Sequence, residues 1–359
     1  MDKKIAKLLT WYHNHHRSLP WRETSDPYYI WLSEVILQQT RVDQGLPYYL
    51  KFVEKYPNVQ ELAFADEQHV YKLWQGLGYY SRAKNMLKAA REIMNSYDGV
   101  FPADLKLLQS LPGIGPYTAA AIASMAFNLP HAVVDGNVYR VLSRVFGIST
   151  PINSSKAFGE FLQVAESLMP RRTPGVFNQA MMELGALVCK PKNPDCLDCP
   201  LSEMCYALAH QQVDQFPVKT SKVKQQTVFY TYYVYTLDEG NLRSVFMKQR
   251  PGSGIWANLF DFPCVETKHV LSLDEMMAEG IKREWLGSSG MLIHHVSEEY
   301  KHLLTHRIIR AKFIWIQLEN PIPDALKKTL LLIEQSSLTE YPVPVLVERY
   351  LRDVKLIAK

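Results

Sequence analysis

The sequence predicts two domains of different fold class: a mainly α N-terminal domain and an α+β C-terminal domain. Residues 1–210 carry apolar residues at helical spacing, with Gly-Pro punctuation and no strand-like alternation. Residues 227–236 are instead dense in β-branched and aromatic side chains, which favour strands. With 359 residues, of which 47% are hydrophobic, the chain can bury two cores. We therefore predict domains at 1–210 and 227–359, joined by a polar linker at 211–226.

Helices account for the elements expected in the N-terminal domain. An amphipathic helix is predicted over residues 1–11. A second helix has a well-marked start, because Asp26 can cap it, Pro27 suits the first helical position, and the pattern continues over 28–39. Further helices are predicted at 104–109, 118–126 and 159–168.

The C-terminal domain is expected to mix strands and helices. Strands are predicted at 227–236, 244–249 and 307–318. A final helix is predicted over 345–355, directly after Pro344.

The overall charge gives only weak information about partners. Charged residues make up 21% of the chain, a normal globular value that argues against wholesale disorder. The net charge of +4 is compatible with a polyanionic partner, although many proteins that bind no nucleic acid share it. We find no signal peptide and no apolar run of about 18 residues. We expect a cytoplasmic protein, nucleoid-associated if bacterial.

Residues 111–122 (LPGIGPYTAAAI) form the first strong motif. A helix is expected to end near Gln109, Gly113 and Gly115 to permit a tight turn with positive φ, and Pro116 to open the next helix. Such a turn exposes backbone N–H groups at a helix N-terminus, which is an anion site. The motif predicts a helix-hairpin-helix that holds a DNA strand through its phosphates. The alternative is an ordinary turn between two helices.

Two acidic residues are candidates for chemistry. Asp135 lies between an apolar pair and a glycine, just before a predicted helix. It can act as an N-cap, or as a carboxylate that stabilises positive charge developing on a sugar, or as both. Glu34 lies among Trp31, Val35 and Leu37, which suggests a sheltered position rather than an ordinary surface glutamate.

Four of the five cysteines are clustered as Cys-x6-Cys-x2-Cys-x5-Cys. Such a cluster in a cytosolic chain favours metal ligation over disulfides. Both Zn²⁺ and a [4Fe–4S] cluster are compatible with four thiolates so close in sequence. Cys264 stands alone and is interpreted as a structural thiol. The four clustered residues are Cys189, Cys196, Cys199 and Cys205.

The order of the hairpin, Asp135 and the cysteine loop along the chain resembles that of the endonuclease III superfamily of helix-hairpin-helix DNA glycosylases. Residue 117 is a lysine in the bifunctional branch, where it forms a Schiff base, but here it is Tyr117, which cannot form an imine. Residues 31–40 (WLSEVILQQT) and 76–80 (GLGYY) are similar to the MutY-type adenine glycosylases. The resemblance implies a [4Fe–4S] cluster in loop 189–205. It also implies a monofunctional enzyme that flips adenine mispaired with 8-oxoguanine or guanine and hydrolyses its glycosidic bond, in base excision repair.

The same resemblance implies roles for individual residues. Glu34 would protonate the leaving adenine, Asp135 would stabilise the sugar cation, and Tyr117 and Asn137 would orient the site. Glu183 matches a supporting acid, with a solvent-facing helix position as its alternative, and Arg22 would line the adenine pocket. The implied DNA-binding residues are Arg22, Leu37, Gln39, Thr40, Tyr79, Gly113, Gly115, Thr305 and His306, with Gln39 and Tyr79 as wedges in the base stack.

The C-terminal domain resembles the MutT (Nudix) nucleotide hydrolase, through residues 254–263 (GIWANLFDFP). It lacks the Gly-x5-Glu-x7-Arg-Glu-x2-Glu-Glu run that places Mg²⁺ ligands, since no paired acids follow Arg283 and Glu284. We therefore expect no nucleotide hydrolysis. The resemblance implies that this domain reads 8-oxoguanine. Where the family commonly shows Phe-Ser-His, this chain has Leu304, Thr305 and His306, so the aromatic ring is missing.

Two alternatives compete with this interpretation. One is a thymine or uracil mismatch glycosylase, against which Glu34 and the C-terminal domain argue. The other is a catalytically silent, iron–sulfur DNA-binding protein, against which the presence of both Glu34 and Asp135 argues. In the favoured case the partner is double-stranded DNA with A:8-oxoG or A:G mispairs, bound by a monomer with no membrane partner.

Overall fold

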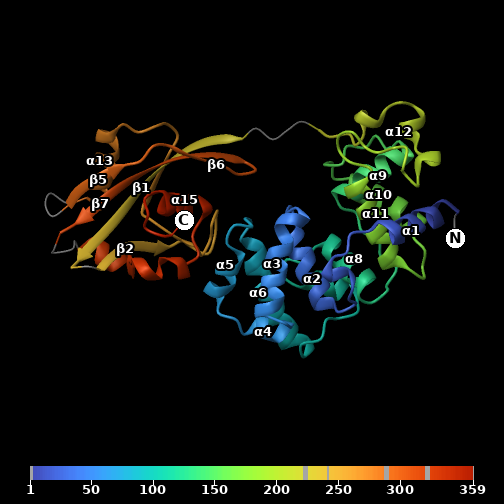
Figure 1. Cartoon of the computed structure of the whole chain (residues 1–359), viewed down its shortest axis with the longest axis horizontal. Coiled ribbons are helices and arrows are strands. Elements are labelled where there is room, and N and C mark those ends of the chain that lie inside the picture. Colours follow the sequence, from blue (N-terminus) through green and yellow to red (C-terminus); the bar gives the residue numbers. More distant parts are fainter. Residues whose placement is uncertain (1–2, 221–224, 241, 287–290, 320–323, 359) are drawn as a thin grey trace. The chain divides into compact units, whose positions relative to one another are not determined.

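The structure is a computed structural model that describes residues 3–220, 225–240, 242–286, 291–319 and 324–358 (Figure 1). It divides into two compact units. The first comprises residues 1–65 and 85–221, and the second comprises 66–84 and 222–359. Residues 66–84, in the middle of the helical part of the sequence, thus group with the second unit. The domain bounds proposed from the sequence stay a prediction.

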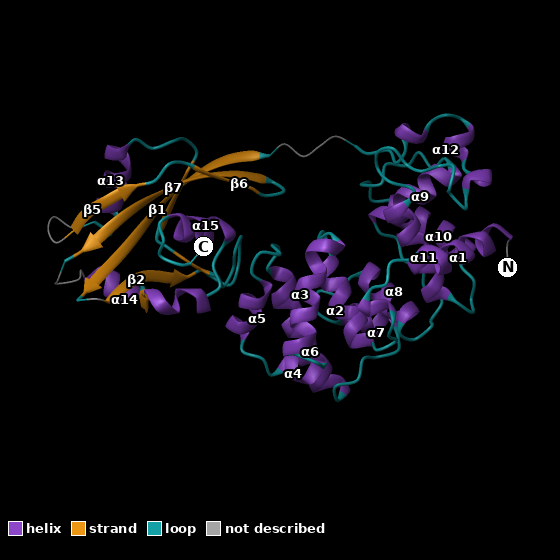
Figure 2. Cartoon of the chain, in the orientation of Figure 1, coloured by secondary structure: helices purple, strands orange, loops and turns teal. Residues whose placement is uncertain are grey.

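Among the described residues up to 210, the regular elements are helices, as expected (Figure 2). Their bounds are α1 Lys3–His15, α2 Pro27–Leu37, α3 Val42–Lys55, α4 Val59–Ala63, α5 Glu67–Trp74, α6 Ser81–Tyr97, α7 Leu105–Ser110, α8 Pro116–Met125, α9 Gly136–Phe146, α10 Ala157–Leu168, α11 Pro174–Leu187 and α12 Tyr206–Ala209. The helices expected at 1–11, 104–109, 118–126 and 159–168 correspond to α1, α7, α8 and α10. In the described part of the chain, no helix is both long and apolar enough to cross a membrane.

Helix α2 shows how the local sequence sets its ends. The Asp26 side chain accepts a hydrogen bond from the Tyr28 amide and caps the helix, with Pro27 in the first turn, as predicted. The helix ends at Leu37 rather than at residue 39. This correction follows from the backbone of Gln38, whose ψ of 112° is not helical, and of Gln39, whose φ of 57° lies in the left-handed region.

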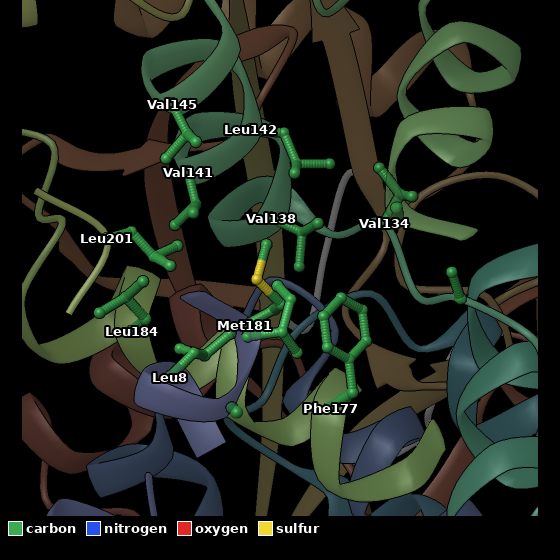
Figure 3. Close-up of a cluster of buried hydrophobic side chains, with 14 of the residues drawn as sticks. Leu8, Val134, Val138, Val141, Leu142, Val145, Phe177, Met181, Leu184 and Leu201 are labelled. Carbon is green, nitrogen blue, oxygen red and sulfur yellow. The ribbon is translucent and has the colours of Figure 1, made fainter. Parts of the chain in front are cut away.

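A buried apolar cluster joins α1, α9 and α11 (Figure 3). Helix α9 contributes four residues to it at helical spacing, and Leu8, Phe177, Met181 and Leu184 come from α1 and α11. Each such side chain stabilises the fold by about 1.5–3 kcal/mol when fully buried. This packing fixes the start of α9 and the inner face of α11, where Asp135 and Glu183 lie. The four residues of α9 are Val138, Val141, Leu142 and Val145.

The second unit is built on a mixed sheet with the strand order β3-β2-β1-β7-β5. Three further strands pair with it: β4 with β1, β6 with β7, and β8 with β2. The long strands β1 and β7 run parallel, from Gln226 opposite Arg307 to Leu237 opposite Leu318, and the other pairings among the described strands are antiparallel. The strands are β1 Gln226–Glu239, β2 Leu242–Gln249, β3 Phe260–Asp261, β4 Cys264–Thr267, β5 Met291–Val296, β6 Tyr300–Leu303, β7 Arg307–Leu318 and β8 Leu331–Glu334. The strand predicted at 307–318 is matched at both ends, and the other two are longer than expected.

Helices cover both faces of this sheet. Tyr233 of β1 packs in a core with Met276 of α13 (Leu273–Lys282), and its hydroxyl donates to the Met276 carbonyl oxygen. Its neighbour Tyr232 points to the opposite face, because side chains alternate along a strand, and stacks on Phe313. Phe313 in turn stacks on Tyr350 of α15 (Val345–Asp353) with ring centroids 4.0 Å apart. Helix α15 ends two residues before the predicted bound, and the small helix α14 spans Asp324–Thr329.

Much of the polar segment expected to be a linker is bonded to the helical unit. The Ile152 amide donates to the Val218 carbonyl oxygen, and the Thr220 amide donates to Asn153 Oδ1, both at 3.0 Å. Arg144 Nε donates to the Phe216 carbonyl oxygen at 3.1 Å. The chain then enters β1 at Gln226.

Candidate active site and DNA-binding elements

Glu34 lies on the buried side of α2 and is 7% exposed. Its sheltered position agrees with the sequence-based expectation. Burial raises the pKa of the Glu34 carboxyl to about 7, and the negative charge of Asp135 acts in the same direction. A hydrogen bond with Tyr117 and the positive charge of Arg22 oppose this rise in the pKa. A carboxyl group with such a pKa is largely protonated just below neutral pH, as a general acid requires.

Asp135 caps helix α9. Its Oδ1 accepts hydrogen bonds from the amides of Asn137 at 2.9 Å and Val138 at 2.8 Å, and its Oδ2 accepts one from Asn137 Nδ2 at 2.8 Å. Burial raises the pKa of Asp135, while these three hydrogen bonds and the charge of Arg140 lower it. The expected N-cap is therefore confirmed, while the catalytic role stays a prediction.

A buried amide positions the segment that leads into Asp135. Asn178 of α11 is 1% exposed, and its Oδ1 accepts a hydrogen bond from the Val133 amide at 3.0 Å. Its Nδ2 donates to the His131 carbonyl oxygen at 2.8 Å and to Ser124 Oγ at 2.9 Å. One side chain thus ties the 131–134 segment to α8 and α11. Sequence reasoning missed Asn178, although an asparagine inside an apolar helix was a usable sign.

Glu183 is a buried anchor for two arginines. It is 1% exposed, so the solvent-facing interpretation is wrong. Arg17 donates to it from Nε at 2.9 Å and from Nη2 at 2.7 Å, and Arg22 does so from Nη1 and Nη2 at the same distances. These hydrogen bonds outweigh burial and lower the pKa of Glu183 to about 2. The pairing holds Arg22 close enough to Glu34 to lower the pKa of that carboxyl. Sequence reasoning missed Arg17.

Tyr117, at the start of α8, lies near both candidate catalytic acids. It hydrogen-bonds Glu34, and its hydroxyl also lies 3.6 Å from Met182 Sδ. Burial raises the pKa of the Tyr117 phenol, and the charges of Glu34 and Asp135 raise it further. Tyr117 therefore stays protonated and can donate a hydrogen bond. Asn137, in addition to bonding Asp135, accepts a hydrogen bond from Arg140 Nη2 at 2.8 Å.

The hairpin between α7 and α8 has the expected helix bounds and one unexpected dihedral angle. Gly113 has a φ of 75°, but Gly115 has a φ of −80° and serves as the N-cap of α8, so only one of the two glycines needs the left-handed region. Leu111 and Ile114 are buried and anchor the turn, while both glycines are exposed. Within the described residues, the Gly113 and Gly115 amides have no protein acceptor. They are therefore available to an anion.

Leu37 is the last residue of α2, and Gln39 and Thr40 lie just beyond it. Gln39 is exposed with a φ of 57°, and Leu37 and Thr40 are partly buried. An exposed polar residue in the left-handed region is uncommon, and such strain often marks a functional position.

Tyr79 and the tip of the β6–β7 hairpin are exposed parts of the second unit. Tyr79 is 47% exposed with a φ of 48°. Its hydroxyl lies 2.5 Å from Thr305 Oγ1. Thr305 and His306 form the exposed tip of the β6–β7 hairpin. The structure thus brings Tyr79 and Thr305 together from distant parts of the sequence.

The four clustered cysteines line one pocket. All four are partly buried, and burial raises the pKa of Cys199 to about 11. Arg144 Nη1 lies 3.4 Å from Cys189 Sγ. In the part of the chain that the structure describes, no three Cys, His, Asp or Glu side chains are close enough together to hold one metal ion. The four thiols surround one pocket and offer only sulfur ligands, a donor set that suits a [4Fe–4S] cluster as well as Zn²⁺.

Two family models match the chain. Residues 32–165 match the HhH-GPD superfamily of base excision DNA repair proteins. Residues 232–353 match the NUDIX domain. The two matches correspond to the helical part and the mixed sheet described above.

Comparisons with individual proteins agree with the family models. The chain is 34% identical over 313 residues to an adenine DNA glycosylase of Buchnera aphidicola subsp. Baizongia pistaciae, covering 86% of this chain and 84% of that protein. It is 45% identical over 217 residues to an adenine DNA glycosylase of Rattus norvegicus, covering 58% of this chain and 42% of that protein.

Solved structures support the fold of the helical part. A thermostable thymine-DNA glycosylase matches with a TM-score of 0.54 and 32% identity, covering 58% of this chain and 98% of that one. A trapped endonuclease III–DNA intermediate matches with a TM-score of 0.51 and 22% identity, covering 58% of this chain and 95% of that one. At that identity, the second likeness shows the fold alone.

Proposed function

The chain belongs to the adenine DNA glycosylase family, and we propose that its substrate is adenine mispaired with 8-oxoguanine or guanine, which it flips out of the duplex and releases by acid-assisted hydrolysis. Adenine excision from DNA in base excision repair is the activity of this enzyme. The proposal for the mechanism rests above all on Glu34, a buried carboxyl group with a pKa near 7 beside Tyr117 and Asp135.

Glu34 is the proposed general acid. Adenine is a poor leaving group unless a ring nitrogen is protonated as the glycosidic bond breaks. Because its pKa lies near 7, Glu34 holds a proton at working pH and still donates it readily. After the transfer, the Glu34 carboxylate can accept a proton from the attacking water. The Tyr117 hydroxyl, which hydrogen-bonds Glu34, keeps the carboxyl group in one orientation.

Asp135 is the proposed partner of the sugar. Departure of adenine leaves oxocarbenium charge on the sugar, and a nearby carboxylate stabilises that charge. Its hydrogen bonds with Asn137 and Val138 hold the Asp135 carboxylate in place and favour its ionised form. Residue 117 carries no amine, so the chemistry relies on water and leaves the DNA strand uncut.

DNA is proposed to be held by elements around this site. The exposed Gly113 and Gly115 amides at the start of α8 suit a phosphate of one strand. Gln39 and Tyr79 are proposed to fill the space left when adenine turns out of the stack. Thr305 and His306 are proposed to contact the base opposite adenine.

We further propose that Cys189, Cys196, Cys199 and Cys205 hold a [4Fe–4S] cluster. When bound, the cluster would crosslink the 189–205 loop to the end of α11. Its test is chemical: the purified protein should be yellow-brown, with iron and acid-labile sulfide in equal amounts. A colourless protein that contains zinc would overturn the assignment.

A single-turnover excision assay tests the proposed function. Duplexes with a central A:8-oxoG, A:G, T:G or U:G pair are incubated with the enzyme and analysed with and without alkali. We expect adenine loss, fastest opposite 8-oxoguanine, with strand breaks only after alkali. The T:G arm matters because the chain is also similar to a thymine-DNA glycosylase structure. Thymine or uracil excision, or breaks without alkali, would overturn the proposed substrate or mechanism. Sedimentation of the enzyme–DNA complex should give one chain per duplex.

A further inference from the structure

The loop between α5 and α6 presents a single aromatic side chain on a strained backbone. Gly76 and Gly78 have φ values of 100° and 74°, and Tyr79 follows with a φ of 48°. Glycine adopts such angles without penalty, but for Tyr79 the left-handed region costs about 1–2 kcal/mol. The Tyr79 ring is nevertheless 47% exposed, so burial of the ring contributes little to offset this cost. Other contacts must hold the loop in this conformation.

Side chains from both flanking helices bond to the loop backbone. Arg82 Nη2 donates to the carbonyl oxygens of Leu77 at 3.3 Å and Gly78 at 3.2 Å. Trp74 Nε1 donates to the same Gly78 oxygen at 3.0 Å, and the Gly76 amide donates to the Tyr80 hydroxyl at 3.3 Å. One arginine thus holds the carbonyls of the two residues that directly precede Tyr79.

The Arg82 guanidinium also lies between two aromatic rings. It is 4.9 Å from the centroid of Trp74 and 5.8 Å from that of Tyr79, both within the range of cation–π attraction. Arg82 is only 9% exposed, and burial lowers its pKa to about 10, so it remains charged at neutral pH. A guanidinium so enclosed is poorly placed to contact a DNA phosphate, but it contacts the Tyr79 ring directly.

A second contact holds the other end of Tyr79. Its hydroxyl lies 2.5 Å from Thr305 Oγ1, at the tip of the β6–β7 hairpin. The ring is therefore fixed at its hydroxyl by Thr305 and along its face by Arg82.

From these contacts we infer that Arg82 is a positioning residue that holds Tyr79 in its left-handed, exposed conformation before DNA binds, and thereby sets the affinity for mispaired duplex. The inference rests on the proposed function, because it takes Tyr79 to enter the base stack. A loop that is already ordered loses less conformational freedom on binding, so affinity rises without any new contact to DNA. If Arg82 is removed, the competent loop conformation becomes a fraction of the population and the apparent Kd rises by the inverse of that fraction.

The test measures DNA affinity in a background that cannot excise the base. Glu34→Gln protein carrying Arg82→Met or Arg82→Lys is titrated against a fluorescent A:8-oxoG duplex at several salt concentrations. We expect Arg82→Met to weaken binding by about tenfold or more, and Arg82→Lys to retain part of the affinity, since it keeps the charge but loses the planar fork. Arg91→Met is the matched control, because Arg91 lies on the same helix and donates to the Ala63 carbonyl oxygen, away from the loop.

Two readouts separate positioning from other roles. If Arg82 acts through Tyr79, then Arg82→Met has little further effect once Tyr79→Ala is present, and the slope of log K against log salt is unchanged. A phosphate contact would instead lower that slope by about one and add its full effect to that of Tyr79→Ala. With Glu34 restored, the single-turnover rate of Arg82→Met at saturating enzyme should stay within about twofold of the parent, since the chemical step is untouched.

The outcomes distinguish this inference from the proposed function. Additive effects of Arg82→Met and Tyr79→Ala, or a reduced salt slope, would overturn the role of Arg82 alone. Unchanged affinity of Tyr79→Ala would overturn the wedge assignment, and this inference with it. Circular dichroism and thermal melting establish that the variants are folded. If Arg82→Met does not fold, the same measurements on Arg82→Lys, alone and combined with Tyr79→Ala, decide between the outcomes.

Discussion

Glu34 and Asp135 are two carboxyl groups whose surroundings differ in kind. Glu34 is buried in α2, and burial favours its neutral form despite the opposing hydrogen bond from Tyr117. Burial raises the pKa of Asp135 as well, but Asp135 accepts three hydrogen bonds from Asn137 and Val138, which favour its ionised form. Groups that differ in this way can divide the work of proton donor and anion between them.

Replacement of the Glu34 carboxyl by an amide tests the proton donor. Glu34→Gln keeps the shape of the side chain but removes the acid, so single-turnover adenine excision should fall by about 10² to 10⁴-fold while mismatch affinity is retained. Excision is followed with an A:8-oxoG duplex, and Glu54→Gln, an exposed glutamate in α3, is the control. Substantial residual excision by Glu34→Gln would contradict the general-acid role.

The raised pKa of Glu34 also predicts a pH dependence of stability. The carboxyl titrates at about 7 in the folded protein, above its ordinary value of 4.5, so the folded state binds the proton more tightly than the unfolded state. This contribution is fully present below about pH 4.5 and is lost as pH rises through 7, on the order of 3 kcal/mol in all. An amide does not titrate, so Glu34→Gln does not lose this stability as the pH rises. Its melting temperature relative to the parent should therefore rise between pH 5 and pH 8, and a constant difference would count against the pKa.

Tyr117 offers a test of which group faces the sugar. Tyr117→Lys places an amine beside Glu34 and Asp135, and an amine there can attack the sugar and form an imine. We expect strand nicking without alkali and a covalent adduct after borohydride reduction, and we expect neither from the parent. Tyr117→Phe serves as the control. Failure to trap any adduct with folded Tyr117→Lys would argue that residue 117 does not face the sugar.

At the scale of elements, α11 positions much of the candidate site from one apolar helix. Asn178 binds the segment that precedes Asp135, and Glu183 binds Arg17 and Arg22. Both side chains are 1% exposed. Buried polar groups are costly unless they are fully bonded, so this helix can adopt few alternative positions. Its packing against α1 and α9 transmits that order to the site.

The α7–α8 hairpin gives a paired prediction for two glycines. Gly113 has a φ of 75°, and a Cβ there would lie 2.6 Å from Asn85 Cβ, whereas Gly115 has a φ of −80° and open space around it. Gly113→Ala should therefore destabilise the protein by about 1–2 kcal/mol or more and weaken DNA binding. Gly115→Ala is the matched control and should leave the melting temperature nearly unchanged. Equal melting temperatures for the two variants would refute the assigned turn geometry.

At the scale of the whole molecule, the two units carry different parts of the proposed task. The first contains Glu34, Asp135 and the cysteine loop, and the second contains Tyr79, Thr305 and His306. Excision chemistry and the choice of the opposite base are thus proposed to depend on different units, which makes them separable by mutation.

Removal of the Thr305 hydroxyl tests that separation. Thr305→Val keeps the shape of the side chain but removes the hydroxyl that is proposed to contact the base opposite adenine, so the preference for A:8-oxoG over A:G should fall. We expect a reduction of about 5- to 20-fold, the loss of roughly one good hydrogen bond, with the A:G rate unchanged. The ratio of single-turnover rates on the two duplexes measures it, with exposed Thr339→Val as the control. An unchanged ratio would remove Thr305 from the recognition of 8-oxoguanine.

The sequence by itself determined the features that depend on neighbouring residues. The Asp26 cap, the Pro116 helix start, the strand at 307–318 and the change from helical to mixed structure were all predictable, because each follows from local backbone preferences. The cysteine spacing likewise placed four thiols around one cavity.

Only the tertiary structure decided which distant residues meet. It buried Glu34 beside Tyr117, paired Glu183 with Arg17 and Arg22, placed Asn178 behind Asp135, and joined residues 66–84 to the second unit. It also raised the pKa of Glu34 to about 7, since that shift depends on desolvation by side chains from other helices. Periodicity and spacing specify the conformation of a segment, whereas burial and electrostatic environment arise only when segments far apart in the chain pack together.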